Sequence, residues 1–336
     1  MMLPPASVSR RALLRALSSA SSAIALGGCA AFSDTVNRFD AAAISTNPTL
    51  LVATNRKPVN GGRDTPWFGP ERARLSVARA TLAPPDQGRF SRAAVGLSDW
   101  SIVRIDPVPK MRDLLVPMPA MRDVLIYVHG FNQTFETAAI DAARLSDGIR
   151  FRGESMVFSW PSKAKLFDYG YDRESAMWSR DALEQVFSGL IANPAVGRIH
   201  IVGHSIGTML TMEALRQIYD RHRGTVVERI GAVVFASPDI DMDVFSSSVE
   251  RIGPLAAKIT VVTSTNDRAL AVSGWIAGGI SRVGAAEQDQ LKQLGLNVVD
   301  ASGQGWGIVN HDLFLSDGQI RQVIRRAVEG RATGPA

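Results

Sequence analysis

Nine residues are the most informative about the fold of this chain, namely Ile199-His200-Ile201-Val202-Gly203-His204-Ser205-Ile206-Gly207. The residues before Gly203 are mostly β-branched and apolar, as in a buried parallel strand. Beyond Gly207, apolar side chains recur at helical spacing over 208–221, namely Met209, Met212, Leu215 and Ile218. Glycines on both sides of Ser205 leave room for backbones that approach closely at a sharp turn. The stretch therefore predicts a strand, a tight turn and a helix, with the Ser205 hydroxyl presented at a nucleophile elbow.

The rest of the chain supplies the strands and helices that such an elbow needs. Strands are predicted over 49–54, 75–82, 100–105, 124–128, 155–160, 198–202, 229–235, 258–264 and 296–299. Helices are predicted over 134–145, 173–192, 208–221 and 319–329. From Asp123 onward the two types alternate, which favours parallel strands joined by right-handed crossovers. We therefore expect an α/β-hydrolase fold, a doubly wound and mostly parallel sheet with helices on both faces.

A serine hydroxyl becomes a good nucleophile when an imidazole takes its proton and a carboxylate orients that imidazole. In this fold the three residues follow one another in the order serine, acid, histidine, on loops after strands. Asp267 comes three residues after the predicted strand 259–264. His311 is the single histidine beyond His222. The predicted catalytic residues are therefore Ser205, Asp267 and His311.

Asp239 is an alternative acid, because Ser237-Pro238-Asp239-Ile240-Asp241 follows the preceding predicted strand. Its other interpretation is a carboxylate that caps a loop or helix, which suits a Pro-Asp pair. The oxyanion hole is expected to combine two backbone N–H groups, those of Phe131 and Ile206. We interpret His129 and His204, which lie near the predicted site, as packing or hydrogen-bonding residues. No histidine pair with carboxylates stands at ligand spacing, so no metal and no cofactor are predicted.

The N-terminal region predicts export and lipid attachment. Ser9-Arg10-Arg11-Ala12-Leu13-Leu14 resembles a twin-arginine motif, and Leu26-Gly27-Gly28-Cys29 resembles a lipobox. We expect an export signal over 1–28, a tether over 29–48 and a hydrolase domain over 49–330. Cys29 is the single cysteine, so no intramolecular disulfide can form, and lipidation there would anchor the protein to the periplasmic side of a bacterial cell envelope. The alternative is an ordinary cleaved signal with an incidental cysteine.

The net charge does not indicate nucleic-acid binding. The chain carries a formal charge of +5. Without residues 1–28, however, 34 basic residues stand against 32 acidic ones. No basic stripe with interleaved aromatic residues is present, so we expect no nucleic-acid partner.

Besides the elbow, the chain contains several ordered blocks, namely Ala53-Thr54-Asn55-Arg56-Lys57, Phe68-Gly69-Pro70-Glu71-Arg72, Val128-His129-Gly130-Phe131-Asn132, Phe158-Ser159-Trp160-Pro161-Ser162, Tyr169-Gly170-Tyr171-Asp172-Arg173-Glu174-Ser175, Ser237-Pro238-Asp239-Ile240-Asp241, Asn266-Asp267-Arg268-Ala269-Leu270 and Arg282-Val283-Gly284. Together these blocks resemble one family, the uncharacterised bacterial esterase/lipase-like α/β-hydrolases that form a domain-of-unknown-function family. The family usually has Gly before the triad histidine, whereas Asn310 precedes His311 here. The resemblance implies a serine hydrolase fold and assigns no natural substrate.

These observations predict a lipid-anchored serine carboxylesterase acting on a small-molecule or lipid acyl ester. The same three residues could serve an acyltransferase or a thioesterase. A non-catalytic envelope lipoprotein that keeps the fold for binding is the alternative from another class. The segment 269–285, with Trp275 and Ile276, is either a wall or lid of the acyl site or an ordinary crossover helix.

Overall fold

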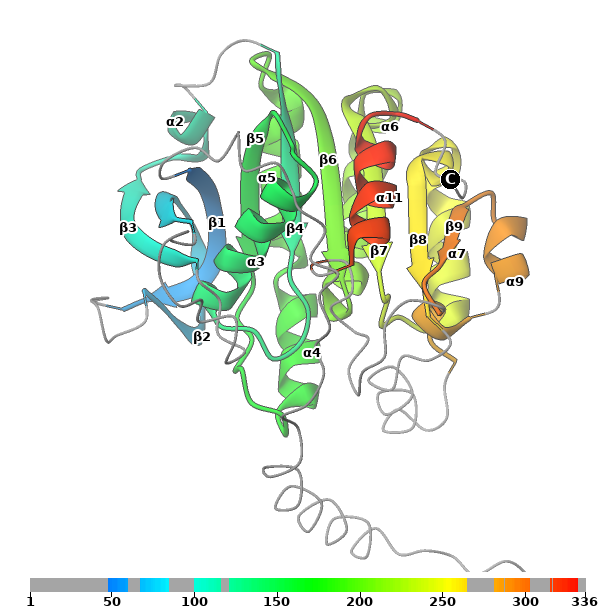
Figure 1. Ribbon diagram of the computed structural model, residues 1–336, viewed down its shortest axis with the longest axis horizontal. Coiled ribbons are helices and arrows are strands. Elements are labelled where there is room, and N and C mark those ends of the chain that lie inside the picture. Colours follow the sequence, from blue (N-terminus) through cyan, green and yellow to red (C-terminus); the bar gives the residue numbers. More distant parts are fainter. Residues whose placement is uncertain are drawn as a thin grey trace, which may run out of the picture. The chain divides into compact units, whose positions relative to one another are not determined.

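The computed structural model describes residues 48–59, 67–84, 100–115, 121–264, 281–286, 288–302, 315 and 317–331. These residues form a nine-stranded sheet in the order β3-β2-β1-β5-β4-β6-β7-β8-β9 (Figure 1). The strands are β1 (Thr49–Pro58), β2 (Phe68–Ala83), β3 (Ser101–Val108), β4 (Arg122–Val128), β5 (Glu154–Ser159), β6 (Val196–His204), β7 (Ile230–Ala236), β8 (Ile259–Thr263) and β9 (Asn297–Asp300). β1, β2 and β3 pair antiparallel, and every other pairing is parallel.

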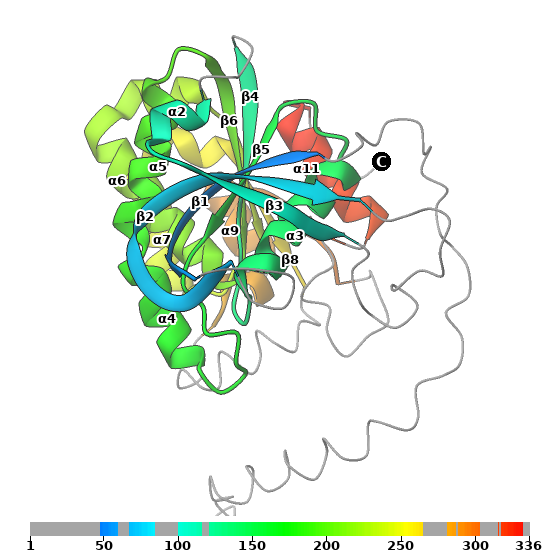
Figure 2. The same ribbon diagram turned by 90° about the vertical axis from the view of Figure 1, so that its left-hand side faces the viewer.

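Helices cover both faces of this sheet (Figure 2). One face packs against α3 (Phe135–Gly148) and α11 (Gly318–Val328), and the other against α2 (Met111–Leu115), α5 (Arg180–Ala192), α6 (Ile206–Arg229) and α7 (Met242–Ile252). Side chains of β4 alternate between the two cores, with Leu125 on the α3 side and Ile126 on the α6 side, as the two-residue period of a strand requires. The predicted doubly wound, mostly parallel α/β-hydrolase fold is confirmed.

The single helix predicted over 173–192 is wrong, because two helices occupy this region. They are α4 (Tyr169–Trp178) and α5, and Ser179 separates them. The Ser179 hydroxyl donates to the carbonyl oxygen of Ser175 at 2.7 Å and accepts the Asn55 Nδ2 of β1 at 2.8 Å. Bonding of a serine side chain to the local backbone competes with a regular helix, and the pattern of apolar residues does not reveal it.

The remaining short elements lie near the edge of the sheet that β8 and β9 form. They are the 3₁₀ turns η3 (Gly253–Lys258) and η4 (Val283–Ala285) and the helix α9 (Gln288–Gln293). Among the helices in the described ranges, none combines the length and the apolar character needed to cross a bilayer.

The strand order creates a switch point at β4. The chain passes from β4 to β5 on one side, and then returns across β4 to β6 on the other. In open α/β sheets, ligands bind at the carboxyl ends of the strands beside such a point. Val128 and Gly203 are register partners at the ends of β4 and β6. The loop that begins at His129 and the elbow at Ser205 are therefore neighbours.

Candidate active site

Ser205 occupies a strained turn between β6 and α6. Its backbone has φ 51° and ψ −123°, a left-handed conformation that is unfavourable for a residue with a Cβ. Its N–H donates to the carbonyl oxygen of Ala236 at 3.0 Å, and its own carbonyl oxygen accepts the N–H of Thr208 at 3.0 Å. A Cβ on Gly207 would collide with the carbonyl oxygens of Val128 and His129. Glycine at 207 thus lets α6 start directly against the end of β4.

Residues 129–133 follow β4, and we call them the oxyanion loop because they include the predicted oxyanion donor Phe131, whose role stays a prediction. A Cβ on Gly130 would lie 2.9 Å from the Ser205 Cβ, so the Gly130 backbone lies directly against the Ser205 side chain. No hydrogen bond within the described ranges uses the Phe131 N–H, and its ring packs edge-on against Tyr169 with centroids 5.4 Å apart. Ile206 is the first residue of α6, where backbone N–H groups have no partner within the helix. Both predicted oxyanion donors therefore flank Ser205.

A buried arginine of β1 contacts the oxyanion loop. Arg56 is 1% exposed, and its guanidinium makes three hydrogen bonds. Nε donates to the Ser159 hydroxyl at 2.9 Å, Nη1 to the carbonyl oxygen of Ser162 at 3.0 Å, and Nη2 to that of Gln133 at 2.7 Å. Burial lowers the pKa of Arg56 to about 10, so the side chain remains a cation at neutral pH.

A buried carboxylate contacts the same loop. Asp172 Oδ2 accepts the Ser162 hydroxyl at 2.5 Å and the Asn132 N–H at 3.3 Å, and Oδ1 accepts the Lys163 N–H at 2.8 Å. The Ser162 hydroxyl also accepts the Gln133 N–H at 3.2 Å. Burial raises the pKa of Asp172, while these hydrogen bonds and the Arg56 charge oppose the rise.

His129 is placed as a packing residue. Its ring stacks on Trp160, with centroids 4.6 Å apart and planes 12° apart. Nδ1 lies 2.8 Å from the Gly130 carbonyl oxygen, and Nε2 lies 3.1 Å from that of Trp160. Burial and then the Arg56 charge hold the pKa of His129 well below its usual value. The imidazole is therefore neutral and donates one hydrogen bond to a backbone carbonyl, and its Nε2 also lies 3.4 Å from the Ser159 hydroxyl. His204 is buried at the end of β6, where its Nδ1 packs against Gly130.

Asp239, the alternative acid, is buried in an ion pair. Its Oδ1 lies 3.1 Å from Arg282 Nε, and both side chains are almost fully buried. Its Oδ2 accepts the Tyr169 hydroxyl at 2.7 Å, and its backbone N–H donates to the Ser205 carbonyl oxygen at 3.3 Å. Each carboxylate oxygen thus has a partner. This arrangement favours a role in holding the elbow over a role as the triad acid.

Asp267, His311 and Cys29 lie outside the described residues, so their predicted roles stay predictions. The described residues on either side of the stretch 265–280 lie together, because the Ser264 N–H donates to the Gly284 carbonyl oxygen at 2.8 Å. In the sequence, Asp267 follows Ser264 by three residues. Whether 269–285 includes a lid or a crossover helix also stays a prediction, although its last residues form η4.

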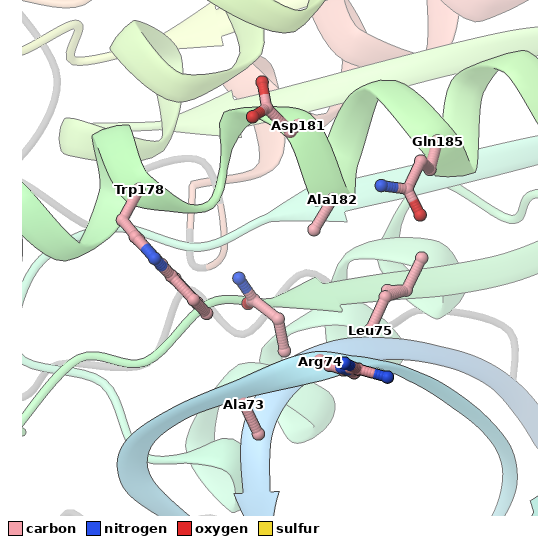
Figure 3. A pocket seen from close by; sticks show the side chains of 8 residues that line it. Ala73, Arg74, Leu75, Trp178, Asp181, Ala182 and Gln185 are labelled. Carbon is pink, nitrogen blue, oxygen red and sulfur yellow. The ribbon is translucent and has the colours of Figure 1, made fainter.

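A cavity of about 470 Å³ lies elsewhere, between β2 and the helices α4 and α5 (Figure 3). Trp178, Asp181 and Gln185 line it on the helices, and residues 73–75 line it on the curved strand. None of its lining residues belongs to the elbow or to the oxyanion loop, so it is not the reaction site. Within the described ranges, no group of three or more metal-ligating side chains occurs.

The family assignment comes from a comparison with known protein families. The model of the family described as alpha/beta hydrolase of unknown function (DUF900) matches residues 114–327. The chain belongs to this family. The matched residues include the oxyanion loop, the elbow and the Asp239–Arg282 pair, and the assignment agrees with the fold and with the resemblance found in the sequence.

Individual relatives are more distant. An uncharacterised protein of Nostoc sp., alr1448, is 33% identical over 64 residues, which is 19% of this chain and 17% of the relative. Among solved structures, Est1E from Butyrivibrio proteoclasticus has a TM-score of 0.38 at 14% identity over 76% of this chain and 93% of its own. A cutinase-like protein from Cryptococcus sp. has 0.37 at 18% identity over 65% and 99%. These structural similarities are weak, so the family assignment rests on the family match over residues 114–327 alone.

Four residues that hold this site, Arg56, Ser162, Asp172 and Arg282, stand in the blocks that carry the family resemblance, but the sequence assigned them no individual role. Arg56 lies beyond the predicted end of the first strand at residue 54, whereas β1 runs to Pro58. The available signal was the charged Arg56 close after an apolar strand. If the strand continued, Arg56 would be buried, and a buried charge requires hydrogen-bond partners.

Proposed function

We propose that this α/β-hydrolase is a serine hydrolase that cleaves acyl esters through an acyl-enzyme formed on Ser205. The observation that carries the proposal is the left-handed backbone of Ser205, pressed against the oxyanion loop. Such a conformation costs about 1–3 kcal/mol and persists where the surrounding structure enforces it, which is common at active sites. It supports a role for the Ser205 hydroxyl as a nucleophile at the carboxyl end of β6.

In the proposed mechanism, Ser205 Oγ attacks the ester carbonyl while His311 takes the hydroxyl proton and Asp267 orients the imidazole. The Phe131 and Ile206 N–H groups stabilise the negative oxygen, and each such donor contributes about 3–4 kcal/mol to transition-state stabilisation. Collapse expels the alcohol, which takes the proton from His311. Water then attacks the acyl-enzyme with the same groups, releasing the acid and restoring Ser205.

The same intermediate could pass its acyl group to an acceptor other than water, or form from a thioester. Added alcohol separates these reactions, because an acyltransferase yields the transferred ester where a hydrolase yields the free acid.

The proposal is tested by labelling the full chain with a fluorophosphonate probe, which reacts with activated serines. We expect the wild type to label, and Ser205→Ala and His311→Ala to lose labelling while their circular dichroism is unchanged. Asp267→Asn and Asp239→Asn compare the predicted acid with the alternative acid. We expect Asp267→Asn to reduce labelling more strongly than Asp239→Asn does. A folded wild type that fails to label contradicts the proposal and favours the binding lipoprotein.

We also propose that Cys29 carries a lipid that anchors the protein to the cell envelope. The lipobox-like residues Leu26–Cys29 support this proposal. Cys29→Ser should move the protein from the membrane fraction to the soluble fraction, or leave its leader uncleaved. Unaltered membrane fractionation and processing would count against lipidation.

A further inference from the structure

We propose that Arg56 and Asp172 are positioning residues that hold the oxyanion loop in its reactive geometry. The inference rests on the proposed serine hydrolase function. Neither side chain belongs to the elbow or to the predicted catalytic residues. Each makes one hydrogen bond to the backbone of residue 132 or 133, directly after the candidate oxyanion donor Phe131.

Arg56 links two loops that belong to neighbouring strands. One side of its guanidinium binds Ser159 and the carbonyl oxygen of Ser162, at and beyond the end of β5. The other side binds the carbonyl oxygen of Gln133 in the oxyanion loop. All three acceptors are neutral, so Arg56 provides three donors in one rigid plane, a geometry that lysine cannot reproduce.

Arg56 binds a backbone carbonyl of this segment, whereas Asp172 binds its backbone N–H groups. Its carboxylate accepts the Asn132 N–H directly, and it accepts the Ser162 hydroxyl, which in turn accepts the Gln133 N–H. Asn132 has φ 60°, a left-handed conformation that asparagine adopts more readily than most residues. The N–H groups of residues 132 and 133 and the carbonyl of residue 133 are therefore all bound by one buried network.

The other end of the loop is also held, since Gly130 abuts Ser205 and His129 packs between Trp160 and the backbone. Phe131 is the residue between the two anchored ends. An oxyanion donor must lie about 2.7–3.1 Å from the developing charge. A displacement of about 1 Å can cost on the order of a hundredfold in rate. Loss of one anchor should therefore act on kcat through the direction of the Phe131 N–H.

The competing explanation is a network that only stabilises the fold. Glu184 of α5 provides the matched control, because it is also a buried carboxylate, binding the Ser188 hydroxyl at 2.8 Å and Arg221 Nη1 at 2.7 Å. Among the described residues, its hydrogen bonds and ion pair go to Ser188 and Arg221 and not to the oxyanion loop. The test set is Arg56→Met, Arg56→Lys, Asp172→Asn and Ser162→Ala, with Glu184→Gln as the control.

Two measurements on the full chain separate the explanations. The first is turnover of a soluble short-chain acyl ester well below the unfolding temperature. We expect kcat to fall roughly 10- to 100-fold in the Arg56 and Asp172 variants, with KM within about twofold, and Glu184→Gln to keep the wild-type kcat. The second is hydrogen exchange by mass spectrometry, in which peptides covering 129–134 should exchange faster in these variants and not in the control.

Arg56→Lys and Ser162→Ala keep the test decisive if Arg56→Met does not fold, because both are milder changes. Wild-type kcat and exchange in folded Arg56→Lys, Asp172→Asn and Ser162→Ala would overturn the inference. An equal loss of kcat in Glu184→Gln would also overturn it. If the wild type neither hydrolyses esters nor reacts with the probe, the proposed function is wrong. The proposed role of Arg56 and Asp172 in catalysis is then wrong as well.

Discussion

Arg56 and Arg282 are both almost fully buried, at 1% and 2% exposed, yet different groups bind their positive charges. In the strand order, β1 with Arg56 lies on one side of β6, and β7 and β8, which precede Arg282, lie on the other. Arg282 faces the carboxylate of Asp239 at 3.1 Å. Arg56 instead donates to a hydroxyl and two backbone carbonyls, and the nearby Asp172 acts through Ser162 and the backbone.

The difference separates two uses of a buried cation. A direct ion pair such as Arg282–Asp239 fixes two residues against each other and leaves a buried charge if one partner is lost. A guanidinium spread over neutral acceptors instead fixes the positions of the backbone segments that carry them. The Arg282 side should therefore dominate stability, and the Arg56 side should dominate the geometry of the oxyanion loop.

The largest expected effect is on the ion pair. Arg282→Met leaves the Asp239 carboxylate buried without its cation, so we expect the free energy of unfolding to fall by about 3–5 kcal/mol. Arg56→Met leaves three neutral acceptors unpaired and removes a nearby positive charge from Asp172, which keeps its own hydrogen bonds, and we expect a loss of about 1–3 kcal/mol. Urea denaturation of both variants, followed by tryptophan fluorescence, measures the difference.

The double variant Arg282→Met/Asp239→Asn is the control for this comparison. It should recover part of the stability, because the unpaired charge is removed with its partner. Equal losses for the two arginine variants, or no recovery in the double variant, would contradict the assignment of the direct pair to stability.

A smaller effect is expected from pH on the Arg56 side. Burial, aided by Arg56, keeps the pKa of His129 well below its usual value of 6.5. The unfolded chain binds a proton at about that value, so folded protein is destabilised as the pH falls below it. While the folded imidazole stays neutral, the slope is about 1.4 kcal/mol per pH unit for one histidine.

His200 adds a second histidine of this kind, because burial lowers its pKa too. His129→Gln should therefore reduce the fall in unfolding free energy between pH 6.5 and pH 5 without abolishing it. Urea denaturation across this range measures the slope, with His222→Gln as the control. An unchanged slope in His129→Gln would show that the histidine does not carry this pH dependence.

The sequence predicted the features that local pattern determines. The elbow follows from glycines around Ser205, and the order of strands and helices follows from apolar periodicity. The packing interpretation of His129 agrees with its stacking on Trp160. The residues after β4 and the elbow are neighbours because β4 and β6 pair, a relation that the α/β-hydrolase topology supplies and that no local pattern contains, and the role of Phe131 and Ile206 as oxyanion donors stays a prediction.

What the sequence did not reveal depends on contacts between distant residues. Arg56 and Ser162 are 106 residues apart, and Asp239 and Arg282 meet across a stretch that contains β8. No periodicity records such pairs. The break at Ser179 was missed for the same reason, since its hydroxyl accepts from Asn55 of β1.

The interleaved order of the strands has a consequence for synthesis of the chain. β4 is completed at Val128, but its partner at Gly203 in β6 is made 75 residues later. Until then, one apolar edge of β4 has no neighbour in the sheet, and such edges promote association with other chains. Parallel pairings between distant segments also form slowly. A nascent chain stalled before β6 should therefore depend on chaperones, whereas one that has passed Gly203 can bury that edge within its own sheet.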